Sequence, residues 1–238
     1  RDDVESRGLG DVYKRQGPHT IPVVEVLPTG PLDMNCLVVH DGTRATVVDP
    51  GMGAADRIRR LVSDRGLTVE QVLLTHGHID HVRDLPEIQE EYGVPAYMHP
   101  DDRPWLLRET LDSLGELGQM HATDRMPTPR VPAPVNDGET LSVAGVDFTA
   151  HLMPGHSPGS VMYRGTLGGT TVILGGDVLF RGGVGRTDLP LSDPHAMMDS
   201  LRRIPEIFDD ADIVYPGHGP ATTVGREKKD NGFLRSVV

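Results

Sequence analysis

The sequence contains a single cysteine, Cys36, in 238 residues. One thiol cannot form a disulfide within the chain, so internal cross-links are excluded and nothing argues for an oxidising compartment. Basic residues are scarce relative to acidic ones, with 23 Lys and Arg against 35 Asp and Glu and a formal net charge of −12. This charge repels phosphate backbones and anionic lipid heads, so the composition predicts no nucleic-acid partner.

Long hydrophobic runs are also lacking. No apolar stretch approaches the roughly 18–20 residues that a membrane-spanning helix needs, so we expect no membrane partner and take the cytoplasm as the default location. Glycine and proline are plentiful instead, at 28 and 20 residues, and lie scattered between apolar segments. This pattern predicts many short elements joined by tight loops.

The first sixteen residues differ from the rest of the chain. Residues 1–16 (RDDVESRGLGDVYKRQ) lack an initiator methionine and apolar periodicity, and carry four basic and four acidic residues. They resemble the translated adapter sequence that contaminates some metagenomic reads. We therefore interpret residues 1–16 as a non-native leader and expect residues 17–238 to form one domain.

Strands and helices are predicted to alternate along residues 17–238, and the first three strands are expected to form an antiparallel meander. β-branched and apolar runs predict strands at residues 20–26, 35–40, 45–48, 69–74, 94–98, 138–152, 160–164, 170–174 and 213–215. Apolar residues at spacings of three and four predict helices at residues 54–65, 82–91, 101–114 and 193–208. Gly168-Gly169 predicts a hairpin turn, and the proline-rich residues 126–134 predict an irregular connection.

Metal-binding residue types are concentrated in the motif HGHIDH at residues 76–81, directly after a predicted strand. Alternate residues of a strand share a face, so His76 and His78 can coordinate one cation. Asp80 and His81 begin the following helix and can reach a neighbouring position. The motif therefore predicts metal binding at a strand-to-helix junction.

Three later residues, His156, Asp177 and His218, each lie at a predicted strand end beside glycine or proline, where backbone and ligand can approach closely. Together with the motif they make seven ligands, enough for two ions. Three histidines would serve one ion, and Asp80, His81 and His218 or an equivalent set would serve the other. Asp177 is the natural bridge, because a carboxylate offers two oxygens and a neutral imidazole cannot span two ions. We expect two divalent ions, zinc in the first place, with iron or manganese also admissible.

Four motifs in order, THGHIDH, PGHSPGS, GGDVLF and PGHG, make the chain resemble the metallo-β-lactamase superfamily over nearly all of residues 17–238. The resemblance implies a four-layer αββα sandwich with α+β and α/β character. It also implies that Asp49 supports the metal site from behind the ligands. The ligand assignment that it implies is His76, His78 and His156 on the first ion, Asp80, His81 and His218 on the second, and Asp177 between them.

Within the superfamily, the segments PGHSPGSVMY, GGDVLFRGGVGRTDLP and YPGHGPATTVGREK look most like the compact glyoxalase II-like hydrolases. That likeness implies a small-molecule thioester of glutathione or a related thiol as substrate. Glyoxalase II carries a helical carboxy-terminal extension with basic residues for glutathione, whereas only twenty residues follow His218 here. Arg186 is left as the candidate contact to a substrate carboxylate. The acyl group, the thiol, the native metal and the oligomeric state stay open.

The residues favour a dinuclear metal hydrolase, in which water acidified by two cations attacks a carbonyl. Asp80 is the candidate catalytic residue, because it would both hold a metal and orient that water. A thioester fits better than an amide, because a thiolate whose parent pKa is about 8.5 departs without a dedicated general acid.

Two alternatives come from other classes. The persulfide dioxygenases of the same superfamily hold one iron on two histidines and an aspartate, which here would be His76, His156 and Asp177. The second alternative is a non-enzymatic metal-binding protein. One iron per chain would indicate the dioxygenase, whereas bound metal without any activity would indicate the binding protein.

Overall fold

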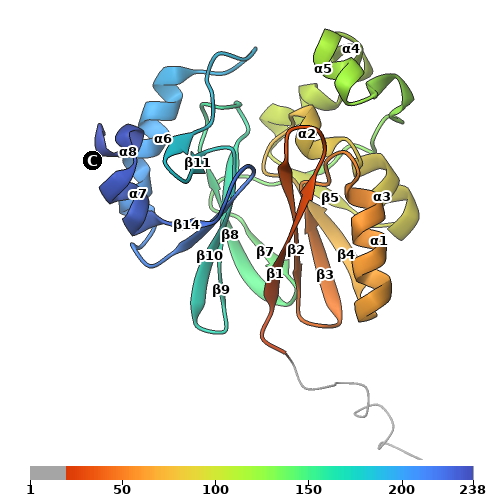
Figure 1. Ribbon diagram of the computed structural model, residues 1–238, viewed down its shortest axis with the longest axis horizontal. Helices are drawn as coiled ribbons and strands as arrows, with labels where there is room; N and C mark the ends of the chain where they lie inside the picture. The colour runs from red at the N-terminus through yellow and green to blue at the C-terminus, as the bar shows by residue number, and fades with distance from the viewer. Residues whose placement is uncertain (1–19, 238) are drawn as a thin grey trace, which may run out of the picture.

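The computed structural model describes residues 20–237, so the leader expected at residues 1–16 lies outside the described residues. Two six-stranded sheets face each other, and helices cover their outer faces (Figure 1). Helices α1 (Ala54–Arg65) and α3 (Leu85–Tyr92) lie outside the first sheet, and α6 (Pro194–Ile207) and α7 (Val224–Asp230) lie outside the second. This arrangement confirms the four-layer αββα sandwich.

The first sheet has the order β1-β2-β3-β4-β5-β6. Its strands are β1 (Val23–Thr29), β2 (Met34–His40), β3 (Arg44–Val48), β4 (Thr68–Leu73), β5 (Ala96–Met98) and β6 (Ala133–Pro134). Strands β1 to β3 pair antiparallel, which confirms the expected meander, and β3 to β6 pair parallel. The prediction of an irregular connection over residues 126–134 is therefore wrong for its last two residues, which form β6. A proline fits in β6 because this edge strand needs pairing on only one side.

The second sheet has the order β14-β13-β10-β9-β8-β7. Its strands are β7 (Thr140–Val143), β8 (Val146–Leu152), β9 (Val161–Leu167), β10 (Thr170–Gly176), β13 (Ile213–Pro216) and β14 (Thr222–Thr223). The hairpin turn at Gly168-Gly169 is confirmed, because both residues take positive φ, 56° and 88°. The single strand expected over residues 138–152 is instead a hairpin, which turns at Ala144 and Gly145 with φ of 48° and 78°. A small separate hairpin joins β11 (Leu179–Phe180) to β12 (Gly183–Val184).

The predicted helices α1 and α6 are confirmed, and Asp193 caps α6 by accepting hydrogen bonds from the backbone of its first turn. The helix expected over residues 82–91 is α3, preceded by the short α2 (Ile79–Val82). The helix expected over residues 101–114 is wrong in form, because the chain breaks there into short pieces. These are η2 (Pro100–Leu106), α4 (Arg108–Asp112), α5 (Gly115–Met120) and η3 (Thr123–Arg125). Pro104 removes a backbone donor and Gly115 takes φ of 57°, so neither residue continues a regular helix. The chain also adds α8 (Gly232–Arg235) after α7.

Three apolar clusters fill the three spaces between the four layers. Ile58 and Val72 belong to the cluster between α1, α3 and the first sheet. Phe148 belongs to the cluster between the sheets, and Ile173 and Leu201 to the one between the second sheet and α6. This packing holds the two sheets together and brings strand ends from both to one place. No helix among residues 20–237 combines the length and the apolar character needed to cross a membrane.

Candidate metal centre

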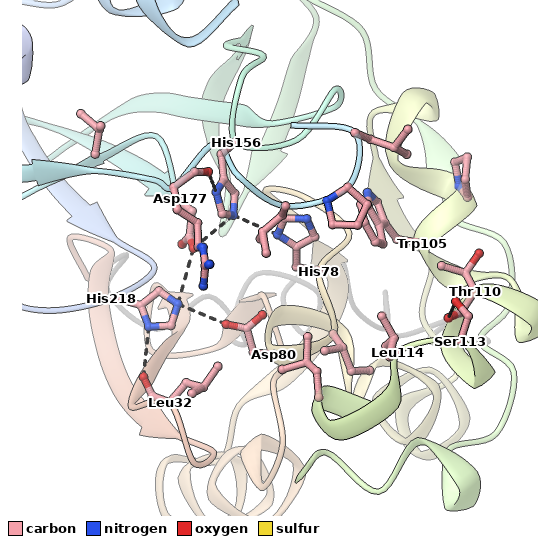
Figure 2. A pocket seen from close by; sticks show the side chains of 18 of the residues that line it. Leu32, His78, Asp80, Trp105, Thr110, Ser113, Leu114, His156, Asp177 and His218 are labelled. Atoms are coloured by element: carbon pink, nitrogen blue, oxygen red, sulfur yellow. Dashed lines mark hydrogen bonds and ion pairs between the residues drawn. The ribbon is translucent and has the colours of Figure 1, made fainter. Parts of the chain in front are cut away.

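The seven predicted ligands lie together, and each follows the carboxyl end of a strand. His76 and His78 lie in the loop after β4, and the helix α2 begins next. The others are Asp80 and His81 in α2, His156 after β8, Asp177 after β10 and His218 after β13. Figure 2 shows His78, Asp80, His156, Asp177 and His218 converging from these loops.

One group of possible ligands consists of three buried histidines, His76, His78 and His156, whose ligand atoms lie within 4.8 Å of one another. The Nδ1 atom of His78 lies 2.9 Å from Nε2 of His156. The other ring nitrogen of His156, Nδ1, donates to the backbone oxygen of Arg186 at 2.8 Å. This bond fixes the tautomer, so Nε2 keeps its lone pair toward the site.

A second group consists of Asp80, His81 and His218, also within 4.8 Å. Oδ2 of Asp80 lies 3.1 Å from Nε2 of His218 and 3.6 Å from Nε2 of His81. His218 donates from Nδ1 to the backbone oxygen of Leu32 at 3.1 Å, which again leaves Nε2 as the inward-facing acceptor.

Asp177 contacts members of both groups with different oxygens. Its Oδ1 lies 3.2 Å from Nε2 of His81. Its Oδ2 lies 3.4 Å from Nε2 of His156 and 3.5 Å from Nε2 of His218. The carboxylate therefore lies where a bridging ligand would have to be, and its bridging role stays a prediction.

Asp49 lies behind the ligands. Its Oδ2 accepts hydrogen bonds from Nδ1 of His81 at 2.9 Å and from Oγ1 of Thr75 at 2.6 Å, and its Oδ1 accepts from the Thr75 backbone at 2.8 Å. Asp49, His76 and His81 also form a third group of possible ligands within 4.8 Å. Because both Asp49 oxygens already accept hydrogen bonds, its geometry suits the support of His81 better than direct ligation.

The environment of the site lowers the pKa of two of its histidines and raises the pKa of a third. Burial lowers the pKa of His78 to about 3 and that of His76 well below its ordinary value, with neighbouring imidazoles adding to the effect. Burial also opposes the charged form of His81, but the carboxylates of Asp177 and Asp80 outweigh it and raise the pKa of His81. His76 and His78 are thus neutral, which is the form that ligates metal.

Several ligand atoms have no hydrogen-bond partner among the described residues. Nε2 of His76 is buried in this state, and so are Nε2 of His81 and Oδ1 of Asp177, which lie 3.2 Å apart as an ion pair but do not form a hydrogen bond. Leaving a buried polar atom unpaired costs about 1–3 kcal/mol, and a bound cation would remove that cost. The donors are nitrogen and oxygen without thiolate, a set that suits zinc, iron or manganese. The residues present therefore fit a dinuclear divalent site.

Asp102 belongs to the site, although it was not predicted from the sequence. From η2 it accepts hydrogen bonds from the backbone of Gly77 at 2.8 Å, the hydroxyl of Ser157 at 2.7 Å and the backbone of Gly159 at 2.6 Å. It thus joins the loop of His78 to the loop after β8. In the sequence, the only signal for this contact was the presence of glycine at the positions that approach Asp102. The structure gives the reason, because a Cβ at Gly159 would lie 2.8 Å from Oδ1 of Asp102.

The ligands open onto a cavity of about 670 Å³, whose lining includes His78, Asp80, His156, Asp177 and His218. This volume lies within the usual range for small-molecule sites.

Arg186 also lines the cavity, as predicted for a substrate contact, but its guanidinium is already paired. Nε and Nη2 donate to the two carboxylate oxygens of Asp188 at 2.6 and 2.7 Å. Both side chains are exposed. The role of Arg186 in binding substrate stays a prediction.

Comparisons with known proteins identify the family. The profile of the metallo-beta-lactamase superfamily matches residues 29–218. The chain is 33% identical over 220 residues to hydroxyacylglutathione hydrolase GloC of Haemophilus influenzae, covering 90% of this chain and 98% of the relative. The structure of TTHA1623 in a di-iron-bound form is 34% identical, with a TM-score of 0.75 over 88% of this chain and 100% of that one. The BLEG-1 B3 metallo-beta-lactamase is 32% identical, with a TM-score of 0.75 over 89% and 99%. This chain is therefore a metallo-hydrolase that belongs to the metallo-β-lactamase superfamily.

Proposed function

We propose that the chain hydrolyses thioesters with the help of two divalent ions held by the seven converging side chains. The observation that carries this proposal is the composition of the cavity. Among the described residues that line it, Asp80 and Asp177 are the only carboxylates, and both belong to the predicted ligand set. No other acid among these lining residues could protonate a poor leaving group, so a thiolate, which leaves unprotonated, suits the cavity best. The name of GloC supports the same reaction.

The reaction adds water across a carbon–sulfur bond. When bound, the ions supply an acidified water and polarise the carbonyl. The attacking water gives up a proton to solvent as a bond forms between its oxygen and the acyl carbon. The carbon–sulfur bond breaks, its electron pair leaves on sulfur as a thiolate, and the carboxylic acid product loses its remaining proton to solvent. The Asp80 carboxylate lines the cavity and can accept a hydrogen bond from the attacking water. His81 is held in place by Asp49 and His156 by the Arg186 backbone, so both rings present Nε2 without rearrangement.

A substrate panel on one preparation tests this function. Purified protein, assayed with its metal content known, is expected to hydrolyse acyl thioesters, to lose that activity on chelation and to regain it on adding a divalent metal. Absence of hydrolysis with every thioester, at full metal occupancy, would overturn the proposal.

The same preparation distinguishes the alternatives. Oxygen consumption with a persulfide, at one iron per chain, would favour the dioxygenase on His76, His156 and Asp177. Bound metal without any turnover would favour the non-enzymatic metal-binding protein. A β-lactam belongs in the panel because of the BLEG-1 neighbour. We expect it to be hydrolysed much more slowly than a thioester, because the departing amide nitrogen needs a proton that no spare acid supplies.

A further inference from the structure

The cavity beside the predicted ligands has a mostly apolar lining, which the hydroxyl residues Thr110 and Ser113 interrupt on the side away from His218. Eleven of the nineteen residues that line it have apolar side chains. Figure 2 shows Trp105 and Leu114 beyond His78 and Asp80, and the rings of His78 and Trp105 lie 4.7 Å apart at their centroids. A ligand whose carbonyl reaches the metal centre therefore has apolar surface directly next to it.

Two separate segments build this surface. Trp105, Leu114 and Leu117 come from the broken helical segment after β5, and Leu189, Pro190 and Leu191 come from the loop before α6. We call these six residues the apolar arm.

Leu191 is 60% exposed and takes φ of 64°, a conformation that a branched residue seldom adopts. An exposed leucine at a cavity rim would lose water-accessible apolar surface if an apolar ligand filled the space beside it, which is favourable.

Charge around the cavity argues against a strongly anionic ligand. Arg186 is the single Lys or Arg among the described residues that line the cavity, and Asp188 already neutralises it. Asp80 and Asp177 also line the cavity, but they belong to the predicted ligand set and would be balanced by the two ions, so the lack of a free cation concerns the lining outside the metal centre. The carboxylates of a glutathione moiety would find no free cation among these residues.

We propose that the substrate is a thioester with an apolar acyl chain, which lies in the apolar arm. This inference rests on the proposed thioester hydrolysis and specifies its substrate class. The acyl side is assigned to the arm because its new carboxylate stays at the metal centre and only an uncharged chain would enter the arm, whereas the thiol side carries the departing anion. Burying an anion among apolar side chains is costly, so the sulfur faces the open side of the cavity.

A chain-length series tests the assignment. Acetyl, butyryl, hexanoyl and octanoyl thioesters of one uncharged thiol, N-acetylcysteamine, are compared by kcat/KM. A fully buried methylene contributes about fourfold, so partial burial is expected to raise kcat/KM at least tenfold from acetyl to hexanoyl. In parallel, calorimetry compares the binding of 2-octanone and 2-butanone, which cannot be hydrolysed, and 2-octanone is expected to bind at least tenfold more tightly.

Variants connect the preference to the arm. Leu191→Ser and Leu114→Ser are expected to reduce the hexanoyl-to-acetyl ratio of kcat/KM at least threefold. Leu107→Ser is the matched control, because Leu107 is 48% exposed in the same segment as Leu114 but does not line the cavity. It is expected to leave the ratio unchanged.

The outcomes separate this inference from the function on which it rests. Hydrolysis of all four thioesters at similar rates would overturn only the apolar acyl substrate. Hydrolysis of none of them at full metal occupancy would overturn the thioesterase proposal and this inference together. Equal effects of Leu191→Ser and Leu107→Ser would show that the arm does not hold the chain.

Discussion

At the scale of single residues, Asp49 connects backbone conformation with the chemistry of the site. Its φ of 51° is unusual for any residue other than glycine, and such a conformation costs on the order of 1 kcal/mol or more. The hydrogen bonds to Thr75 and His81 hold this conformation in place. Sequence alone could suggest Asp49 only through the family resemblance, because the contact to His81 spans 32 positions of the chain.

Asp80 is the residue at which binding and turnover can be separated. Asp80→Ala is expected to keep the fold and the ion held by His76, His78 and His156, because none of those ligands changes. Thioester turnover is expected to fall by two orders of magnitude or more, equivalent to about 2.7 kcal/mol of transition-state stabilisation. Steady-state kinetics and metal analysis of the same sample measure both effects. Retained thioesterase activity would contradict the role of Asp80.

Asp177 lies between the two ligand groups and so has a different expected phenotype. Asp177→Asn keeps the shape of the side chain but removes a negative charge between two cations. Repulsion between the ions rises, so we expect one of the two to be lost, and metal analysis after dialysis to show a stoichiometry near one. Glu227→Gln tests whether any buried carboxylate has this effect, because Glu227 is buried in α7 beyond the predicted ligands. Retention of both ions by Asp177→Asn would contradict a bridging position.

At the scale of elements, the site depends on loops that different strands deliver to one place. Predicted strands and helices with regular apolar spacing, such as α1 and α6, are confirmed because their signals are local. The segment after β5 was not predictable in the same way, since Pro104 and Gly115 break it into pieces whose positions depend on tertiary contacts. Asp102 was missed for a related reason: its partners lie 25, 55 and 57 positions away.

Asp102 is expected to control how firmly two ligand loops are held. In Asp102→Asn, an amide group replaces one oxygen that now accepts from Gly77, Ser157 or Gly159, so a buried donor loses its partner at a cost of about 1–3 kcal/mol. A lower Tm and faster loss of metal to a chelator are expected. Asp101→Asn is the control, because Asp101 is exposed in the same turn. Identical Tm and metal loss in the two variants would show that Asp102 does not position the loops.

At the scale of the whole molecule, the two sheets and the metal centre depend on each other. The first sheet delivers His76 and His78, and the second delivers His156, Asp177 and His218. The four-layer architecture could be expected from the sequence only through the family resemblance that the four motifs carry. The apolar arm could not, because its two segments are about seventy residues apart and only the fold brings them together.

We propose that residues 17–238 form a single domain and that residues 1–16 contribute nothing to it. Deleting residues 1–16 is expected to leave both Tm and thioester turnover unchanged, because this segment has no periodic apolar residues to bury. Thermal unfolding and kinetics of the two forms measure this. A large drop in either quantity would show that the segment is part of the native structure.

The central claim is that seven side chains hold two divalent ions that together support thioester hydrolysis. The most direct measurement is a metal titration of the apoprotein, in which bound metal per chain and thioester turnover are followed on the same samples. The account predicts that binding saturates at two ions per chain and that turnover reaches its maximum only as the second ion binds. Saturation at one ion per chain under metal excess, or full turnover at one ion, would contradict it.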